Sequence, residues 1–579
     1  MSEQRIQGLG VSAGTRIGRV HLYRPQAATD SLSRKQVAEA DVPAELERLR
    51  AAKEQSLEQL QALVEKTKQS LGADKAVILE GQTSILADPT FFPEMEKRIQ
   101  GQLVSAELAV DQVVEQIAGL FESLPQEYMR ERAADVRDVG KRLRTNLGGN
   151  SGVSLADIQQ EVVLVADDLT PSDTVQLDKT YILGIVTRTG GKTSHTAILA
   201  KSLGIPAVLG IGAALDTIEQ GDLLLLDGNT GACVLHPLES TVEEARRRME
   251  DEHHQSQALS VYANQPAVTR DGHQIEVVAN IGTTLESRSS LAEGAEGIGL
   301  FRTEFLFMNA TSMPTEEEQF AAYREVAENL QGHPVVIRTL DIGGDKELPY
   351  LELPKELNPF LGYRAIRLCL DRPEILLTQL RAILRASVHG QLKVMFPMIS
   401  NLQEWRQAKA LWLQAQEQLR AEGVAFADGI EVGMMVEIPS AALLADQFAK
   451  EVDFFSIGTN DLVQYTVAVD RMNEKVADLY DYFHPAVLRL IQMVIEAGHR
   501  EGKWTGMCGG MAGDPQATPL LLGLGLDEWS MDAGSIAKIK HAVHGLHRAD
   551  CVALAQRLLT LGTAPEIRTE LQTYLQQPE

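Results

Sequence analysis

The chain is 579 residues long, with 44% hydrophobic and 23% charged residues and a formal net charge of −26 at pH 7. This length exceeds what one hydrophobic core ordinarily supports, so we expect about three or four domains. The acidic balance argues against non-specific nucleic-acid binding, which depends on basic side chains that neutralise phosphates. We interpret the negative charge as a solvated surface rather than as a docking site for a basic partner.

The sequence indicates a cytoplasmic protein. Its first residues, Met1 to Arg5, are polar and lack the apolar core of a secretion signal. No apolar run reaches the roughly 18 residues that a membrane-spanning helix needs, so we expect no membrane insertion. The cysteines have no C-x-x-C spacing, which argues against a zinc site or a disulfide framework and fits a reducing compartment. They are Cys233, Cys369, Cys508 and Cys551.

The first part of the chain predicts a small α/β domain interrupted by helices. Residues 6–11 and 17–22 predict a strand pair with a turn at Ala13-Gly14. Leucines then recur at three- and four-residue steps, a pattern typical of amphipathic helices, within an insert that we bound at 26–147. Further helical patterns cover 75–86, 92–100, 104–123 and 126–147. This periodicity fits a docking groove and a plain structural bundle equally well.

Strands and short helices alternate after the insert. Apolar segments predict strands at 161–166, 181–186, 207–209, 222–226 and 232–235. Together with residues 1–25, they predict an α/β domain whose second part spans 148–236. The next segment, 237–262, is highly charged and predicts an exposed linker helix.

The last part of the chain, residues 263–579, has a different rhythm. Short apolar segments with polar ends recur eight times, and amphipathic helical stretches separate most of them. These segments are 276–280, 297–302, 335–338, 393–397, 432–437, 454–458, 504–508 and 528–531. Eight strand–helix units in a span of this size predict a (β/α)8 barrel. The predicted fold class is therefore α/β and multidomain, with a helical insert in the first domain.

Polar side chains lie at the C-terminal ends of the predicted barrel strands, where such barrels carry their functional groups. They are Arg302, Arg338, Glu437, Asn460, Asp461 and Cys508. The arginines, with Arg364 and Arg471 as further candidates, can bind phosphate and carboxylate oxygens through two parallel hydrogen bonds. Glu437 and Asp461 offer the oxygen ligands that Mg²⁺ prefers, and Cys508 can give a proton to a carbon. Each residue alone is typical of ion pairs or packing, but their convergence on one face predicts phosphoryl transfer.

Residues 189–200 contain a histidine in a setting that favours an anion. Gly190 and Gly191 follow a predicted strand, and a helical pattern begins nearby. Ser194 is of the type that caps helices, which predicts His195 in the first helical turn, where free N–H groups and the helix dipole attract phosphate. His195 is thus a candidate for covalent phosphorylation, and a capping or core histidine is the equally weighted alternative. A phosphate-binding P-loop is rejected, because its first glycine is missing at the required spacing.

Several long motifs, in order along the chain, resemble the Enzyme I family of phosphoenolpyruvate-protein phosphotransferases, from the bacterial sugar phosphotransferase system. Residues 190–197 resemble the phosphohistidine signature of phosphoenolpyruvate-utilising enzymes. In the barrel the resembling segments are 301–308, 338–346, 457–462 and 503–509, and in the helical insert 131–138. The resemblance covers essentially the whole chain and implies a swivelling phosphohistidine domain, a helical insert and a (β/α)8 barrel.

The resemblance implies a role for individual residues. His195 would carry the phosphoryl group on Nε2, with Thr174 as a supporting hydrogen-bond partner. Glu437 and Asp461 would hold Mg²⁺, and Cys508 would protonate enolpyruvate to pyruvate. The residues that would bind phosphoenolpyruvate are Arg302, Arg338, Asn460, Asp461 and Arg471, with Lys346 and Arg364 at further polar positions of the pocket.

The resemblance also implies partners and a motion. The insert at 26–147 would dock the small phosphocarrier protein HPr, and the barrel would mediate homodimerisation. His195 would visit both the barrel and HPr by swivelling about the segments near 148–152 and 236–262.

Two positions depart from the family pattern. Gly510 stands where a glutamate usually follows Cys508-Gly509, which removes a carboxylate beside the implied proton donor. Lys192 replaces the arginine often found before Thr-Ser-His, and lysine keeps the charge but loses the two-pronged hydrogen bonding.

Three rival functions have less support from the sequence. A dikinase or phosphoenolpyruvate synthase needs an ATP-binding domain, for which this length leaves no room. A nitrogen-regulatory relative of Enzyme I typically carries a further N-terminal sensory domain, which we do not expect here. A regulatory protein without turnover has only Gly510 in its favour.

Overall fold

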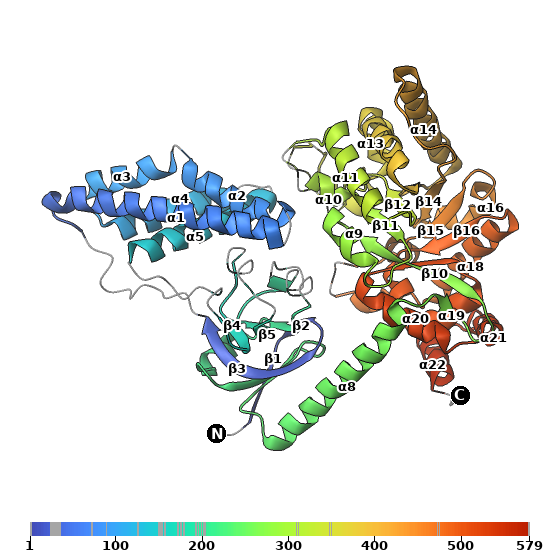
Figure 1. Ribbon diagram of the computed structural model, residues 1–579, viewed down its shortest axis with the longest axis horizontal. Helices are drawn as coiled ribbons and strands as arrows, with labels where there is room; N and C mark the ends of the chain where they lie inside the picture. Colours follow the sequence, from blue (N-terminus) through green and yellow to red (C-terminus); the bar gives the residue numbers. More distant parts are fainter. Residues whose placement is uncertain are drawn as a thin grey trace. The chain divides into compact units, whose positions relative to one another are not determined.

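The computed structural model divides into two compact units, Met1–His254 and Gln255–Glu579. Figure 1 shows the helices and strands of both. The described residues are 3–23, 36–70, 73–88, 90–123, 127–148, 155, 158–170, 173, 177, 180–191, 194, 196–197, 200, 204–308, 310, 312–344, 346, 348, 350–351, 353–471, 473 and 475–576.

The first unit contains an eight-stranded sheet with the order β1-β8-β7-β3-β4-β5-β6-β2. Its strands are β1 (Gln4–Gln7), β2 (Leu9–Ser12), β3 (Thr15–Tyr23), β4 (Val162–Ala166), β5 (Ile182–Thr187), β6 (Ala207–Leu209), β7 (Leu223–Asp227) and β8 (Ala232–Leu235). Successive residues of β4 join different hydrophobic clusters: Val163 and Val165 belong to one, Leu164 and Ala166 to the other. Because side chains alternate between the faces of a strand, this sheet is covered on both faces.

The predicted pairing within residues 6–23 is wrong. One predicted strand, 6–11, is two short strands, and these lie at opposite edges of the sheet: β1 pairs with β8, and β2 with β6. β3 pairs instead with β4 and β7. Gly8 lies between β1 and β2, where its N–H donates to the carbonyl of Gly231 at 2.9 Å. A Cβ at Gly8 would lie 2.7 Å from Val208 Cγ1. The chain can therefore pass from β1 to β2 at this point only if the residue has no side chain.

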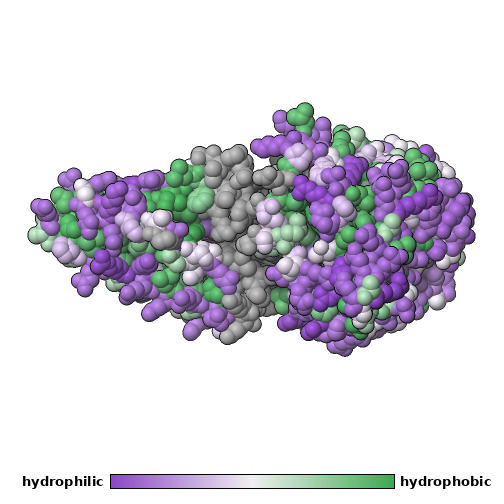
Figure 2. Space-filling model, turned by 90° about the horizontal axis from the view of Figure 1, so that it is seen from above, coloured by the Kyte–Doolittle hydropathy of each residue, from purple (hydrophilic) through white to green (hydrophobic). Residues whose placement is uncertain are grey.

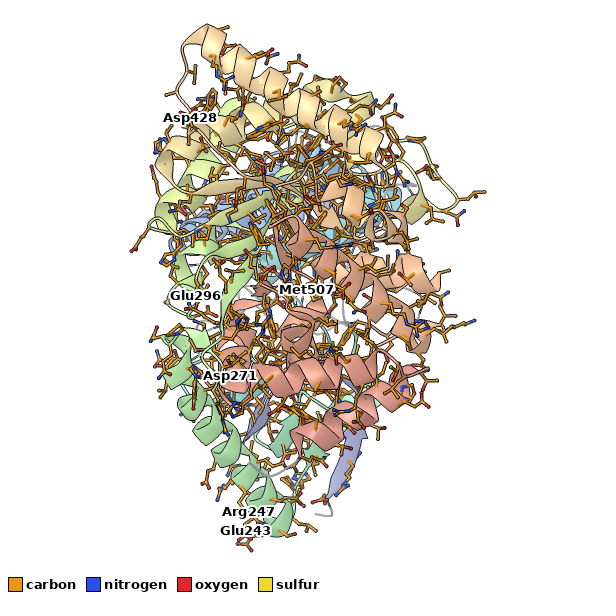
Figure 3. The ribbon with its side chains drawn as sticks, turned by 90° about the vertical axis from the view of Figure 1, so that its right-hand side faces the viewer. Glu243, Arg247, Asp271, Glu296, Asp428 and Met507 are labelled. Atoms are coloured by element: carbon orange, nitrogen blue, oxygen red, sulfur yellow. The ribbon has the colours of Figure 1, made fainter. Side chains whose placement is uncertain are left out.

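The predicted helical insert is confirmed, and its described residues form five helices. They are α1 (Val42–Ser70), α2 (Ala73–Ala87), α3 (Phe91–Gln102), α4 (Ala106–Ser123) and α5 (Glu127–Leu147), and Figure 1 shows them lying side by side. Their shared core includes Leu60, Val110 and Val139, each fully buried. The predicted helix at 237–262 is also confirmed, as α8 (Glu239–Ala263). Glu243 and Arg247, labelled near its start in Figure 3, are exposed.

The second unit is the predicted (β/α)8 barrel. Its strands are β10 (Gln274–Ile281), β11 (Ile298–Arg302), β12 (Val335–Arg338), β13 (Leu392–Phe396), β14 (Val432–Val436), β15 (Phe454–Ile457), β16 (Trp504–Met507) and β17 (Glu528–Met531). Each strand runs parallel to the next, and β10 pairs with both β11 and β17, which closes the ring. A short strand, β9 (Ala267–Val268), pairs antiparallel with β10.

The helices of the second unit separate the barrel strands, as the sequence pattern predicts. They are α9 (Thr284–Ser290), α10 (Glu304–Met308), α11 (Glu316–Asn329), α12 (Ile366–Asp371), α13 (Pro373–Ala386), α14 (Leu402–Glu422), α15 (Pro439–Leu443), α16 (Ala445–Phe448), α17 (Thr459–Val467), α18 (Pro485–Arg500), α19 (Thr518–Leu524), α20 (Ala533–His544), α21 (Arg548–Leu558) and α22 (Ala564–Leu575). Leu300, Val336 and Met435 are among the buried side chains of a small cluster contributed by the barrel strands.

Hydrophilic side chains cover most of the face shown in Figure 2, in keeping with the net charge of −26. Within the described part of the chain, every helix is too short or too polar to span a bilayer.

We expect Gly8→Ala to destabilise the first unit by about 1–3 kcal/mol, because overpacking a tight site forces its neighbours apart. The matched control is Gly101→Ala in α3, where a Cβ would meet nothing within 4 Å. That change should be neutral or add about 0.5–1 kcal/mol, since alanine is the better helix former. Calorimetric unfolding of the full chain measures both variants. Equal transition temperatures for the two would contradict the proposed crossing constraint.

Candidate active site

The carboxyl ends of the barrel strands bring the predicted polar residues to one rim. Arg302 ends β11, Arg338 ends β12, and the two are directly paired in the register of these strands. Glu437 and Cys508 directly follow β14 and β16, and Met507, labelled in Figure 3, marks the end of β16. Parallel strands of a barrel end on the same face, so the spacing of these residues in sequence becomes proximity in space.

Arg338 is buried and held by two carboxylates. Its Nη2 donates to Glu304 Oε1 at 2.6 Å, and its Nη1 lies 3.2 Å from Asp341 Oδ2. Lys346 Nζ also donates to Glu304 Oε1, at 2.8 Å. Burial disfavours the charged form of Glu304, but the two cations outweigh it and lower the pKa of this carboxyl. The Nε of Arg338 is buried without a hydrogen-bond partner, which leaves a donor for a ligand.

A second arginine pair surrounds Asp461. Arg364 Nη1 lies 3.5 Å and Arg471 Nη1 3.7 Å from Asp461 Oδ1. Arg364 also binds Asp341 Oδ1, with an Nη2–Oδ1 distance of 2.9 Å. The guanidinium carbons of both arginines lie 5.8 Å from the ring centre of Phe360, within reach of a cation–π contact. Four cationic side chains thus converge on the pair Asp341 and Asp461, namely Arg338, Lys346, Arg364 and Arg471.

Arg302 and Asn460 are less enclosed. Arg302 is half-buried and makes no side-chain hydrogen bond or ion pair within the described part of the chain, so its whole fork is available. Asn460 is exposed, and its Oδ1 accepts a hydrogen bond from the N–H of Gly510 at 3.1 Å. A Cβ at Gly510 would have only that oxygen within 4 Å, at 3.6 Å, so the position has room for a side chain.

Glu437 and Asp461 form a buried acidic pair, 1% and 7% exposed. Burial, Asp461 and Asp341 raise the pKa of Glu437 to about 8, because two carboxylates in a dry site resist ionising together. Asp461 Oδ1 is buried and accepts no hydrogen bond. Among the described residues, no group of three or more His, Cys, Asp or Glu side chains could hold a metal. Two protein carboxylates fit Mg²⁺, which usually takes its remaining oxygens from water and substrate phosphates.

Cys508 is a buried thiol at the end of β16. Its N–H donates to the carbonyl of Ile457 at 3.1 Å, and its Sγ accepts a hydrogen bond from Ser456 Oγ at 3.4 Å. Burial raises the pKa of the Cys508 thiol to about 11, so sulfur keeps its proton near neutral pH. A thiol in this state can act as an acid.

His195, Thr174 and Lys192 lie outside the described residues. Their described neighbours form a well-bonded segment: Ser194 Oγ accepts from the N–H of Ala197 at 3.3 Å, as a helix N-cap does. Thr196 Oγ1 donates to the carbonyl of Leu169 at 3.5 Å. The N–H groups of Arg188 and Thr189 donate to the carbonyls of Ala166 and Asp167 at 3.0 and 3.2 Å. The loop after β4 therefore supports the segment on both sides of His195.

Four supporting residues escaped the sequence reasoning. They are Glu304, Asp341 and Ser456, and Asn280, whose Nδ2 donates to the carbonyl of Cys508 at 3.1 Å. Glu304 and Asp341 follow the ends of β11 and β12 by two and three residues, a position that could have marked them. Ser456 and Asn280 lie inside their strands, where the sequence carries no such signal.

Three family profiles match the chain: the N-terminal domain of phosphoenolpyruvate-utilising enzymes over residues 7–132, their mobile domain over 158–231, and their phosphoenolpyruvate-binding domain over 256–548. Among curated proteins, the phosphoenolpyruvate-protein phosphotransferase of Geobacillus stearothermophilus is 51% identical over 98% of this chain and 97% of its own length. The phosphotransferase of the same name from Bacillus subtilis is 49% identical over 97% of this chain and 98% of its own length. Identity at this level over nearly the full length, on a barrel that gathers these side chains at one rim, shows that the chain belongs to the phosphoenolpyruvate-protein phosphotransferase family.

Proposed function

We propose that this protein transfers the phosphoryl group of phosphoenolpyruvate through His195 to the histidine of the phosphocarrier HPr and releases pyruvate, the first step of sugar uptake by the phosphotransferase system. The observation that carries the proposal is the rim of the barrel, where arginines and a lysine face a buried pair of carboxylates. Phosphoryl transfer depends on positioning and charge neutralisation, which this set of groups supplies.

The substrate would bind through its phosphate and its carboxylate. The guanidinium group of Arg302 makes no hydrogen bond or ion pair with the described residues, so its N–H groups can bind a ligand. Arg338 keeps a free Nε donor, while Glu304 and Asp341 hold its other two nitrogens. Asn460 is exposed, so its side chain is accessible to a ligand. The remaining groups that we assign to substrate binding are Asp461, Arg471, Lys346 and Arg364.

Glu437 and Asp461 would hold Mg²⁺, which when bound would neutralise negative charge on the substrate oxygens. Asp461 Oδ1 supports this role, because it is buried and accepts no hydrogen bond from the described residues, and the two arginines that face it, Arg364 and Arg471, lie 3.5 and 3.7 Å away. Two buried carboxylates without a cation repel each other, which raises the pKa of Glu437. A bound Mg²⁺ would relieve this repulsion.

In the reaction, the bond between phosphorus and the enol oxygen would break as Nε2 of His195 bonds to phosphorus. Enolpyruvate remains, and the thiol of Cys508 would then give its proton to C3. Burial, which keeps Cys508 protonated, suits this acid role. The phosphoryl group on His195 passes afterwards to the histidine of HPr.

We divide the chain into four parts. The phosphohistidine domain comprises 1–25 and 148–236, the HPr-binding helical domain 26–147, the linker helix 237–262, and the barrel 263–579. His195 belongs to a different compact unit from the barrel rim, so the two must approach for the reaction to occur. The swivel would turn about the segments near 148–152 and 236–262.

The barrel would also form a homodimer. Large apolar side chains are exposed on this unit, among them Leu357, Leu361 and Leu479 at 99%, 64% and 61%, and burying such side chains against a second copy would be favourable. All four cysteines are buried and free, which supports a cytoplasmic location.

Purified protein incubated with labelled phosphoenolpyruvate and Mg²⁺ should gain one acid-labile, base-stable label, because phosphohistidine has this stability. His195→Ala should gain none, whereas the control His547→Ala, at an exposed position of the barrel unit, should be labelled normally. Scintillation counting after acid and base treatment measures the label. A label that persists in His195→Ala would refute the assignment of the carrier.

Glu437→Gln should abolish the Mg²⁺-dependent rise in thermal stability that we expect of the unmodified protein. Without Mg²⁺, the variant should be at least as stable as the parent, because it removes one partner of a repelling pair. Calorimetry with and without Mg²⁺ tests this independently of activity. An unchanged Mg²⁺ response would remove Glu437 from the metal site.

Cys508→Ala should slow pyruvate formation by roughly 100-fold or more, as expected for loss of a general acid. Binding of phosphoenolpyruvate should persist, since Cys508 makes no ion pair with the described side chains of the rim. Pyruvate release coupled to lactate dehydrogenase measures the rate, and direct titration measures binding. Full turnover by this variant would show that another group supplies the proton.

A further inference from the structure

The backbone around Cys508 is fixed from two sides. Its N–H donates to the carbonyl of Ile457 on β15 at 3.1 Å, and its carbonyl accepts from Asn280 Nδ2 on β10, also at 3.1 Å. Asn280 is held in turn, because its Oδ1 accepts from Ser530 Oγ at 2.6 Å. With the backbone anchored, the orientation of the sulfur depends on what the thiol itself touches.

Among the described residues, Ser456 makes the closest polar contact with the thiol. Its Oγ donates to Cys508 Sγ at 3.4 Å, and the two side chains are 1% and 4% exposed. Within the described part of the chain, this is the hydroxyl's only hydrogen bond. The thiol's own contact, from Sγ to the carbonyl of Ile457, is longer at 3.9 Å, so the S–H proton can turn toward another acceptor.

We propose that Ser456 is a positioning residue for proton donation by Cys508: its hydroxyl fixes the sulfur and stabilises the thiolate that donation leaves behind. This inference rests on the proposed function and adds to it a residue that acts through Cys508. In the step, the S–H bond breaks and a C–H bond forms at C3 of enolpyruvate. The π electrons of the enolate make the new C–H bond, its oxygen becomes the ketone of pyruvate, and the S–H electron pair stays on sulfur.

The charges that face Cys508 come from three other strands. Arg302 at the end of β11 and Arg338 at the end of β12 favour a thiolate, whereas Glu437, directly after β14, opposes it. Burial dominates and raises the pKa of the thiol, and the Ser456 hydrogen bond acts in the opposite direction. Without this hydroxyl the thiol would be a weaker acid in a looser position, and proton donation would slow.

The test separates two rates in the full-length protein. We expect Ser456→Ala to form pyruvate about 10- to 100-fold more slowly, the range set by losing one hydrogen bond to a charged group. Single-turnover labelling of His195 by phosphoenolpyruvate should keep its rate, because phosphoryl transfer precedes protonation. The solvent deuterium isotope effect on pyruvate formation should rise, and Ser456→Thr, which keeps a hydroxyl, should recover most of the rate.

The matched control is Thr505→Val on the neighbouring strand β16. This change removes a buried hydroxyl that has no hydrogen-bond partner among the described residues. Gly506 is paired with Ser456 in the register of β15 and β16, so the side chain of Thr505, the residue before Gly506, points to the opposite face of the sheet from Ser456. This variant should form pyruvate at the parent rate.

Three outcomes overturn the inference. Ser456→Ala could form pyruvate at the parent rate while Cys508→Ala is slow. The Ser456→Ala change could slow labelling and pyruvate formation equally, which is the result of a general structural role. If Cys508→Ala itself keeps full turnover, the proposed acid fails first, and the role of Ser456 fails with it.

Discussion

Four buried carboxylates at the barrel rim set the main constraint on this structure. Glu304, Asp341, Glu437 and Asp461 are each at most 7% exposed, and an isolated buried charge is costly unless it is paired. Arg338, Arg364 and Lys346 pair with the first two, which lowers the pKa of Glu304 and Asp341. Glu437 is left as the poorly compensated member, and its pKa rises accordingly. The rim can therefore accept a cation beside Glu437 and an anion beside the arginines.

The barrel fixes the positions of the charged side chains at its rim. The register pairs Arg302 with Arg338 on adjacent strands, and the alternation of side chains directs every second residue toward the axis. Below the rim, the small apolar cluster with Leu300, Val336, Met395 and Phe454 excludes water. Cys508 belongs to this cluster, so the thiol lies at the boundary between the dry interior and the charged rim. That boundary explains why its environment combines burial with two nearby arginines.

The first unit holds the segment that follows β5, a strand that lies inside its sheet between β4 and β6. Hydrogen bonds from Arg188, Thr189 and Thr196 connect the described residues on either side of position 195 to the end of β4 and the residues that follow it. Thr170 of the loop after β4 donates its N–H to Asp173 Oδ2 at 3.1 Å, and Asp173 is held in turn, because its Oδ1 accepts from Tyr23 OH at 2.6 Å and its Oδ2 from Lys141 Nζ at 3.3 Å. Lys141 lies on α5, so the helical insert contributes directly to the support of this loop.

By itself, the sequence determined the elements whose signal is local. Hydrophobic periodicity located the eight barrel strands, the helical insert and α8. The position of a polar residue at the end of a strand marked Arg302, Arg338, Glu437 and Cys508. The roles assigned to these four residues stay predictions. Only the tertiary structure decided what pairs with what. β1 and β2 lie at opposite edges of the sheet, and Gly8 leaves room for the chain to pass between them. Periodicity does not predict this arrangement, because strand pairing depends on residues far apart in the sequence. Likewise Glu304, Asp341, Asn280 and Ser456 became part of the site because folding, rather than spacing, brings their side chains to the arginines and the thiol.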